Sequence, residues 1–425
     1  MAANQAPPFH VNLRGFFGGD NFGDNLMAAA ITGVIGRAAQ RAGQSVVASG
    51  SGIEVAQDLD PELGMELVGT TADGVKSSGR RGHLSLLSAS MASVVRFRGY
   101  RAAVKGWFRA GMLVAAWSTR TVLHASGVRR SASLSALETI NVVHYIGGGY
   151  IASAFMDRVL AEILFVWSYR RVHPAPRVIA TGLGVGPLYR GWERRAARAL
   201  LSQLDSITVR ETSSLELVKD IGVMTPTTLA LDDALLLLDA RPLEGRGARV
   251  ALNLKSFSGL RYNRDKVERL VNALRRRWPS VDLVRLSGDD RVLSGALGVD
   301  DLFDRVVDFS DMTWPDIYSV IAEYGAAVGS AYHFCVLFAA RGIPIVATYQ
   351  GEYYRQKITG VVPTLSDAAV VVAYEDVTGD NVLTLIETAA KSNGPRSGLA
   401  NDCRRQRLAY EAAYVEEMTH TPRSQ

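Results

Sequence analysis

A histidine, His333, stands directly after a strand-like run, in a position where a side chain can do chemistry. The apolar residues 326–328 predict a buried strand. Gly329 and Ser330 interrupt it, and Ser330 can cap the apolar helix expected over 334–341. His333 is therefore expected at the carboxyl end of a parallel strand, the edge where open α/β sheets bind ligands. A histidine there can act as a general acid or base. A hydrogen-bonded structural histidine is the alternative, and both interpretations stay open.

A Gly-rich turn near the N-terminus could hold an anion. Residues 18–25 carry glycine, asparagine and aspartate between a strand expected over 11–17 and a helix expected over 26–39. Such a turn leads the backbone amides of a helix N-terminus toward an anionic ligand. The spacing is not that of a dinucleotide-binding fingerprint, and many glycine turns of this kind bind nothing. Both readings of this turn remain.

Two further strand ends carry groups that fit an acidic ligand. The strand expected over 141–146 is followed by three glycines, Gly147, Gly148 and Gly149. Without side chains, they let backbone amides approach a ligand closely. Arg210 ends the strand expected over 206–210, and a guanidinium can bind a phosphate or a carboxylate through two parallel hydrogen bonds. An ion pair with the neighbouring Glu211 is the alternative.

The elements that position these residues alternate between strand and helix along both halves of the chain. The Pro- and Gly-containing segment 241–247 is the best candidate for a linker between the halves. We therefore predict two doubly wound, Rossmann-like α/β domains facing a cleft, in a GT-B-like arrangement. The expected domains cover 1–240 and 247–395, and a C-terminal helix and tail cover 396–425.

The composition fits a globular protein with acidic partners. The 425 residues carry a formal net charge of +5, which favours anionic partners without choosing among them. Cys335 and Cys403 do not make a disulfide framework, so a reducing cytoplasm is expected. The N-terminus has no basic segment followed by an apolar core and does not resemble a signal peptide. No run is long and apolar enough to span a bilayer.

A basic stretch interrupts the N-terminal half. Between positions 74 and 137 there is no Asp or Glu, and eleven Lys and Arg residues alternate with aliphatic side chains and with Trp107, Phe108 and Trp117. This pattern is typical of helices that lie on an anionic membrane surface. A solvated basic insertion packed on the first domain is the alternative. Nucleic acid is not the expected partner, because no nucleic-acid-binding motif occurs. A cytoplasmic protein, peripheral at the inner face of the membrane, fits the first interpretation.

Short motifs occur along the chain in one order, each too short to be specific alone. They are N-x-G-D-x-L at 21–26, G-G-G at 147–149, G-x-G-P at 184–187, V-R-E-x-x-S at 209–214, an acidic residue at Asp232 and Y-x-x-K at 354–357. In this order and spacing they resemble the polysaccharide pyruvyl transferase family. The resemblance extends from the first predicted strand to about Val361.

This resemblance implies transfer of an enolpyruvyl unit from phosphoenolpyruvate to a sugar of a polysaccharide or of its lipid-linked precursor, closed into a ketal. It implies His333 as a catalytic residue with Asp24 as its partner. It also implies substrate-binding residues: Asn25, Gly147, Gly148, Gly149, Arg210, Ser330, Tyr354 and Lys357. Phosphoenolpyruvate is then a substrate, and no cofactor is required. No cluster with metal-ligand spacing appears in the sequence.

The implied reaction requires cations, an acid and a base, and few side chains can provide them. Arg210 and Lys357 are the candidate cations for the donor's phosphate and carboxylate. An acid must protonate the enol carbon, and a base must take the proton of the sugar hydroxyl. His333 can fill either role. A helix N-terminus disfavours its imidazolium and favours the base, whereas a bound anionic donor favours the acid.

The chain departs from the family at one position. The family carries an arginine beside its catalytic histidine, in S-x-R-x-H or S-R-x-H, where this chain has Ala331. That arginine is thought to help hold the donor. Arg355, Lys357 or Lys255 could replace it.

Two other functions stay open on the sequence. A glycosyltransferase of the same two-domain architecture would use the glycine turns for a nucleotide diphosphate, and the fold alone does not exclude it. A catalytically weakened, membrane-associated protein of polysaccharide assembly would fit the missing arginine and the basic stretch.

Overall fold

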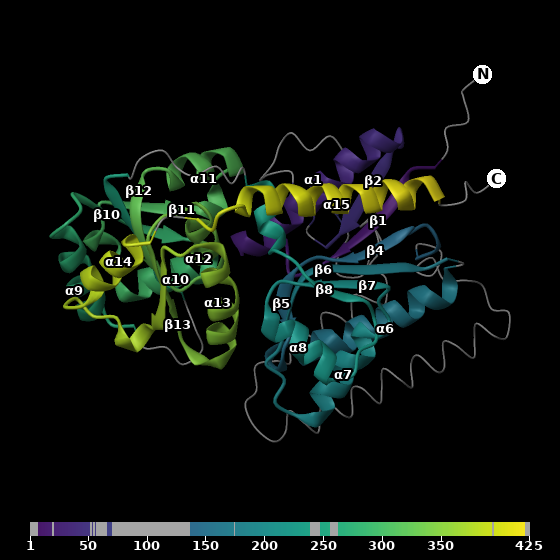
Figure 1. Cartoon of the computed structure of the whole chain (residues 1–425), viewed down its shortest axis with the longest axis horizontal. Coiled ribbons are helices and arrows are strands. Elements are labelled where there is room, and N and C mark those ends of the chain that lie inside the picture. The colour runs from purple at the N-terminus through teal and green to yellow at the C-terminus, as the bar shows by residue number, and fades with distance from the viewer. Residues whose placement is uncertain are drawn as a thin grey trace.

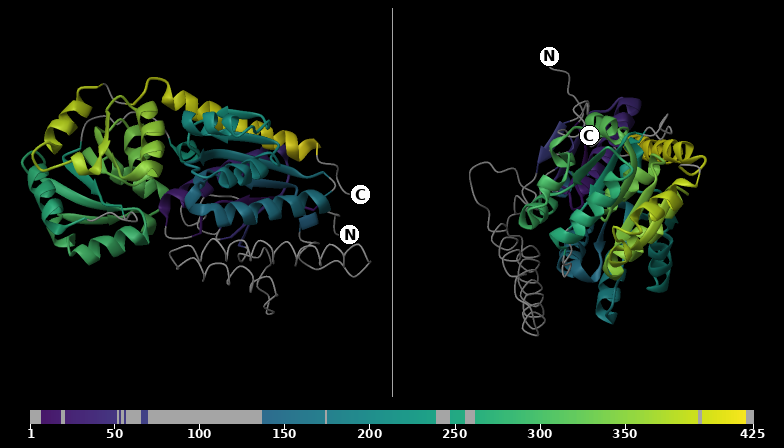
Figure 2. Two further views of the ribbon diagram at one scale, coloured as in Figure 1. Left: turned by 90° about the horizontal axis from the view of Figure 1, so that it is seen from below. Right: turned by 90° about the vertical axis from the view of Figure 1, so that its left-hand side faces the viewer.

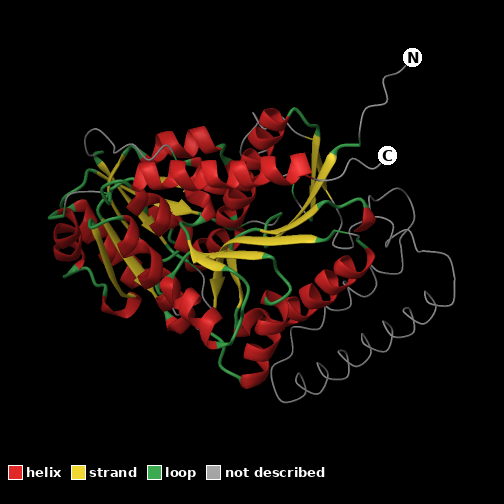
Figure 3. Ribbon diagram, turned by 45° about the vertical axis from the view of Figure 1, so that its right-hand side comes forward, coloured by secondary structure: helices red, strands yellow, loops and turns green. Residues whose placement is uncertain are grey.

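The computed structural model describes residues 7–18, 21–51, 53, 56, 66–69, 137–173, 175–238, 247–255, 262–392 and 395–420. They form two α/β domains, each built on a parallel sheet (Figure 1). In both domains the strands run between layers of helices (Figure 3). The predicted class, two doubly wound α/β domains, is confirmed.

The N-terminal domain has a sheet in which every described pairing is parallel. Its strands are β1 (Phe9–Arg14), β2 (Val46–Gly50), β3 (Glu66–Gly69), β4 (Val142–Tyr145), β5 (Gly148–Ile151), β6 (Arg177–Val185), β7 (Ser206–Val209) and β8 (Thr227–Leu229). Its helices are α1 (Phe22–Ala42), η1 (Ser153–Phe155), α6 (Met156–Val172), α7 (Gly191–Leu201), α8 (Thr212–Asp220) and η2 (Asp233–Leu237). The order is β3-β2-β1-β4-β6-β7-β8, with β5 beside β6. The direction of winding reverses between β1 and β4, which creates a ligand-binding crevice at their carboxyl ends.

The C-terminal domain repeats this plan. Its strands are β9 (Arg249–Asn253), β10 (Ser280–Arg285), β11 (Arg305–Asp308), β12 (Tyr324–Gly329), β13 (Ile345–Tyr349) and β14 (Ala369–Ala373). Its helices are α9 (Arg264–Arg275), α10 (Gly288–Leu297), η3 (Asp300–Leu302), η4 (Phe309–Asp311), α11 (Trp314–Ile321), α12 (Tyr332–Ala340), α13 (Gly351–Leu365), η5 (Tyr374–Asp376) and α14 (Val382–Ala390), and α15 (Leu399–His420) follows. The order β11-β10-β9-β12-β13-β14 places the reversal between β9 and β12.

The residue pattern explains why β4, β12 and α12 lie in the core. All residues of β4, β12 and α12 are buried. Strands of a parallel sheet covered on both faces are apolar throughout rather than alternating. A helix that is apolar on all sides must likewise be enclosed. In α12 the buried Phe334 and Phe338 pack with ring centroids 4.4 Å apart. The element that carries His333 is therefore rigidly embedded.

Two local predictions are wrong. The helix expected over 26–39 begins at Phe22, because its first turn packs against the C-terminal domain. Ser330 does not cap α12. Ala331 is the N-cap residue and makes no side-chain capping bond, since the Ser330 hydroxyl lies 2.5 Å from Thr348 Oγ1 inside the domain.

The two domains are joined through α1, at its first turn and along its length. At its start, the Phe22 amide donates to the Leu286 carbonyl at 2.9 Å, and the Phe22 ring meets Phe309 edge-on. Along its length α1 packs against α15, which runs from the C-terminal domain across the N-terminal one (Figures 1 and 2). There Glu411 is buried and forms ion pairs with Arg37 and Arg41 at 2.6 and 2.8 Å. The crevices of the two sheets are thereby held face to face.

The basic stretch predicted over 74–137 lies outside the described residues apart from its last position. In the part of the chain that is described, no helix is long and apolar enough to cross a membrane.

Candidate active site

The carboxyl ends of β1, β4, β9 and β12 meet around a cavity of about 310 Å³. It is lined by Phe16, Asn21, Asp24, Gly149 and Phe155 from the N-terminal domain and by Lys255, Leu286, Ala331, Tyr332, His333, Tyr353, Tyr354 and Lys357 from the C-terminal one. Both crevices therefore open into one site. A hollow of mixed aromatic and charged lining between two domains is a common setting for a small-molecule site.

The ring of His333 lies in the first turn of α12 and packs against the first turn of α1. A Cβ at Gly23 would lie 1.7 Å from His333 Nδ1, so the imidazole fits there because residue 23 has no side chain. On the other side, Nε2 lies 3.8 Å from Oδ1 of Asp232. His333 is 7% exposed, and among the described residues its Nε2 has no hydrogen-bond partner. Residues of the other domain thus fix the ring on two sides.

Asp24 supplies a carboxyl to the same cavity from the first turn of α1. Asn21 Nδ2 donates to Asp24 Oδ2 at 2.5 Å. Burial raises the pKa of Asp24 above its usual value, while the charges of Lys357 and Arg210 oppose that rise. A carboxyl whose proton is retained more easily can serve as a general acid as well as a base.

Lys357 brings a cation to the cavity from α13. Its Nζ donates to Tyr353 Oη at 3.2 Å, and that hydroxyl donates to the Gly149 carbonyl at 3.0 Å. The rings of Tyr353 and Tyr332 lie 4.8 and 5.0 Å from Nζ. Burial, followed by the charge of Arg210, lowers the pKa of Lys357 to about 8. The ammonium is therefore charged at neutral pH but loses its proton within a mildly alkaline range.

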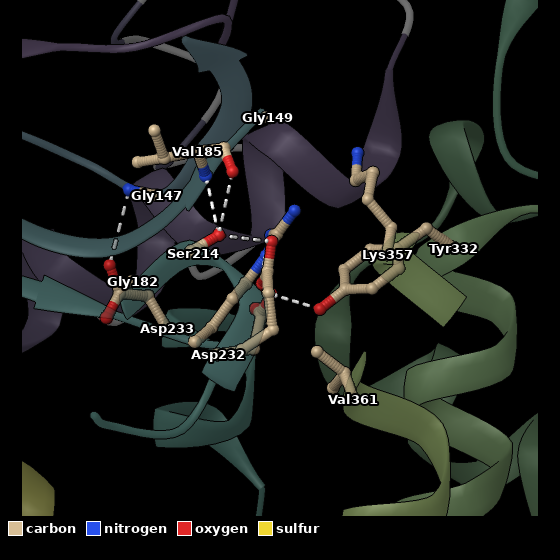
Figure 4. A network of polar contacts seen from close by, with 12 residues as sticks. Gly147, Gly149, Gly182, Val185, Ser214, Asp232, Asp233, Tyr332, Lys357 and Val361 are labelled. Atoms are coloured by element: carbon tan, nitrogen blue, oxygen red, sulfur yellow. Dashed lines mark hydrogen bonds and ion pairs between the residues drawn. The ribbon is translucent and has the colours of Figure 1, made fainter. Parts of the chain in front are cut away.

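Arg210 lies behind the wall of the cavity and does not line it. Its fully buried guanidinium donates to Asp232 Oδ2 at 2.7 Å and to Glu211 Oε2 at 3.3 Å. The Tyr332 ring lies 4.3 Å from its Cζ, and the Tyr332 hydroxyl reaches across to Asp232 at 3.0 Å (Figure 4). Burial works to raise the pKa of Asp232, but the charge of Arg210, together with hydrogen bonds to the carboxylate such as that from the Ala234 amide, holds that pKa well below the usual range. His333 therefore faces a fixed negative charge.

A second buried carboxyl supports the triple-glycine loop. Asp233 Oδ2 accepts a hydrogen bond from the Thr181 hydroxyl at 2.6 Å. It also accepts one from the Gly147 amide at 3.4 Å (Figure 4). Gly182 has a φ of +58°, and a Cβ there would lie 2.8 Å from this carboxyl group. Burial raises the pKa of Asp233 to about 7. The loop that leads to Gly149 thus rests on a group that titrates near neutrality.

The structure divides the ten residues predicted for the site into two groups. Those that line the cavity are Asp24, Gly149, His333, Tyr354 and Lys357. Those that do not are Asn25, Gly147, Gly148, Arg210 and Ser330. In the second group, Asn25 Oδ1 accepts a hydrogen bond from the Gly18 amide at 2.9 Å, which ties the turn after β1 to α1. Contacts with substrate stay predictions for both groups.

Sequence reasoning missed much of the aromatic lining. Tyr353 precedes Lys357 by four residues, so on a helix the two share a face, and this spacing could have revealed it. Tyr332 carried no such signal, because its contacts with Arg210 and Asp232 join different domains. Among the described residues, no group of three or more His, Cys, Asp or Glu side chains is placed to hold a metal ion.

Comparison with known proteins adds a family and a fold. Residues 78–350, more than half of the chain, match the family model for polysaccharide pyruvyl transferase. No curated protein sequence gives a significant match.

Among solved structures, one described as a UDP-N-acetylglucosamine 2-epimerase from Listeria monocytogenes matches with a TM-score of 0.51 at 10% identity, over 99% of both chains. Sucrose-phosphate synthase from Thermosynechococcus elongatus matches with a TM-score of 0.47 at 14% identity, over 97% of this chain and 98% of that one. MurG from Acinetobacter baumannii gives 0.46 at 12% identity, over 97% and 100%. At such identities the likeness concerns the fold, which is the predicted GT-B-like one.

Proposed function

The chain belongs to the polysaccharide pyruvyl transferase family, and from that premise we propose that it transfers pyruvate from phosphoenolpyruvate to a sugar as a cyclic ketal. The acceptor is a sugar of a polysaccharide or of its lipid-linked precursor. The donor carries a phosphate and a carboxylate, and the acceptor offers two hydroxyl groups.

The observation that carries this proposal is the convergence of three ionisable groups on one cavity. His333, Asp24 and Lys357 come from three helices and two domains, yet all line the same space. Ketal formation requires proton transfer to carbon, proton removal from oxygen and neutralisation of an acidic donor. An imidazole and a carboxyl suit the two proton transfers, and an ammonium suits the third task.

The burial of Asp24 supports its role as the acid. A raised pKa makes Asp24 easier to protonate than an exposed aspartate, as an acid toward the methylene carbon of the donor requires. His333 then acts as the base toward the sugar hydroxyl. Asp232, 3.8 Å from Nε2, stabilises the imidazolium that forms. It is a positioning residue, because it meets the histidine and not the donor.

A proton from Asp24 forms a C–H bond at the methylene carbon, and the adjacent carbon becomes cationic. The first sugar hydroxyl forms a C–O bond there and gives its proton to His333. The bond from this carbon to the phosphate oxygen then breaks, and a second hydroxyl closes the ketal. Its proton leaves with the phosphate, and the proton held by His333 returns to Asp24 through solvent.

The basic stretch over 74–137 supports a location for the acceptor. We infer that it holds the protein against an anionic membrane surface, where a lipid-linked glycan would be presented. Each Lys or Arg near such a surface contributes about 1 kcal/mol.

Mass spectrometry of the glycan product tests the proposal. The full chain is incubated with phosphoenolpyruvate and lipid-linked glycans, and separately with nucleotide sugars and the same glycans. A pyruvyl ketal formed only with phosphoenolpyruvate, with release of one phosphate, is the expected result. A glycosyl addition from nucleotide sugars, without ketal formation, would instead identify a glycosyltransferase. No product with either donor would favour an assembly protein.

A further inference from the structure

Ala331, where the family places an arginine, faces the cavity without a charge. It is the N-cap residue of α12 and lines the cavity. Its backbone amide donates to Asn253 Oδ1 at 2.8 Å. A donor bound beside α12 therefore lacks a cationic side chain at the place where the resemblance to the family implies one.

The three cations that could replace this arginine differ in their position relative to the cavity. Arg355 is half-exposed, forms an ion pair with Glu352 at 2.8 Å and does not line the cavity. Lys357 lines it from α13, beside Gly149 of the N-terminal domain, where a Cβ would lie 3.1 Å from Nζ. Lys255 lines it as well, from the segment that follows β9 in the same domain.

Lys255 and Ala331 occupy equivalent places on neighbouring strand ends. In the parallel pair β9–β12, Asn253 is in register with Gly329. Lys255 and Ala331 each follow two residues later. Adjacent strands lie about 4.8 Å apart, so the two residues leave the sheet side by side at the reversal of its winding. The side chain of Lys255 therefore starts next to position 331, where the arginine is missing.

The surroundings of Lys255 indicate a cation held for a ligand. Its Nζ donates to Ser287 Oγ at 2.8 Å, and Ser287 is the N-cap residue of α10. A helix N-terminus carries a positive partial charge, which disfavours a cation. The buried Asp290, 3.2 Å away, offsets this. An ammonium has three donors, and these two residues are its side-chain partners within the described part of the chain. A purely structural partner for Asp290 would not need to face the cavity.

We propose that Lys255 supplies the contact to an anionic group of phosphoenolpyruvate, its phosphate or its carboxylate, that relatives obtain from the arginine at position 331. This inference rests on the proposed function. Lys357 and Lys255 then bind the donor from two elements of the C-terminal domain, one at each anionic end.

Calorimetric titration of the full chain with phosphoenolpyruvate, without acceptor, tests this assignment. Lys255→Met should weaken binding by about ten- to a hundredfold, as expected for one charge-assisted hydrogen bond. Arg355→Met removes the same charge outside the cavity and should change binding less than about twofold. Ala331→Arg in the Lys255→Met background should restore most of the lost affinity.

The controls separate this inference from folding and from the proposed function. Because Lys255→Met leaves Asp290 without its partner, Lys255→Met/Asp290→Asn is titrated as well, and the same loss is expected. If Lys255→Met and the double variant bind the donor as tightly as Arg355→Met does, the inference is overturned while the proposed function stands. If the wild-type chain binds no phosphoenolpyruvate, both are overturned.

Discussion

At the scale of single residues, His333 is the group on which the proposed chemistry depends most. Its ring is held between Gly23 and Asp232, both from the other domain. His333→Ala should lower kcat by about a hundredfold to ten-thousandfold, the usual contribution of a general acid or base. His420→Ala, at the exposed end of α15, is the control and should keep full activity. Thermal unfolding of both variants shows whether the fold is retained. A folded His333→Ala enzyme with normal kcat would refute the assignment.

Lys357 makes the reaction sensitive to alkaline pH. Burial lowers its pKa to about 8, so the ammonium charge is present below that pH and is lost above it. The KM for phosphoenolpyruvate should therefore rise between about pH 8 and pH 10, approaching tenfold per unit. Lys357→Arg keeps its charge throughout this range and should give a KM that no longer depends on pH there. An alkaline rise that persists in Lys357→Arg would assign the titration to another group.

At the scale of elements, the first turn of α1 determines where the histidine of α12 sits. A Cβ at Gly23 would overlap the imidazole, whereas a Cβ at Gly36, on the same helix, would meet no atom within 4 Å. Gly23→Ala should displace the ring and lower kcat by about a hundredfold. Gly36→Ala should leave kcat unchanged and raise stability by about 1 kcal/mol, because alanine favours the helix. Equal kcat values for the two variants would show that the packing of Gly23 is irrelevant to catalysis.

The same elements show what local pattern can and cannot predict. The apolar run of β12, the break at Gly329 and Ser330 and the apolar helix α12 were sufficient to place His333 at a strand edge. The start of α1 was missed because Phe22 is held by Phe309 of the other domain. The covering of Arg210 by Tyr332 has the same origin. Periodicity reports which face of an element is buried, but contacts between domains depend on how the sheets are docked.

At the scale of the whole molecule, the basic stretch over 74–137 predicts a preference for anionic surfaces. The full chain should float with vesicles that contain phosphatidylglycerol and remain behind with vesicles of phosphatidylcholine alone. High salt should abolish the binding, because attraction to surface charge is screened. Equal binding to both vesicle types, or none to either, would reject a membrane role for this stretch.

The most direct test of pyruvyl transfer follows one proton. In the proposed reaction a proton of solvent origin, delivered by Asp24, becomes the third hydrogen of the pyruvyl methyl group. The reaction is run in D₂O with phosphoenolpyruvate and the acceptor glycan, and the product is examined by NMR and mass spectrometry. The predicted product is a ketal whose methyl group carries one deuterium. A ketal with an unlabelled methyl group, or no ketal at all from the wild-type chain, would contradict the account.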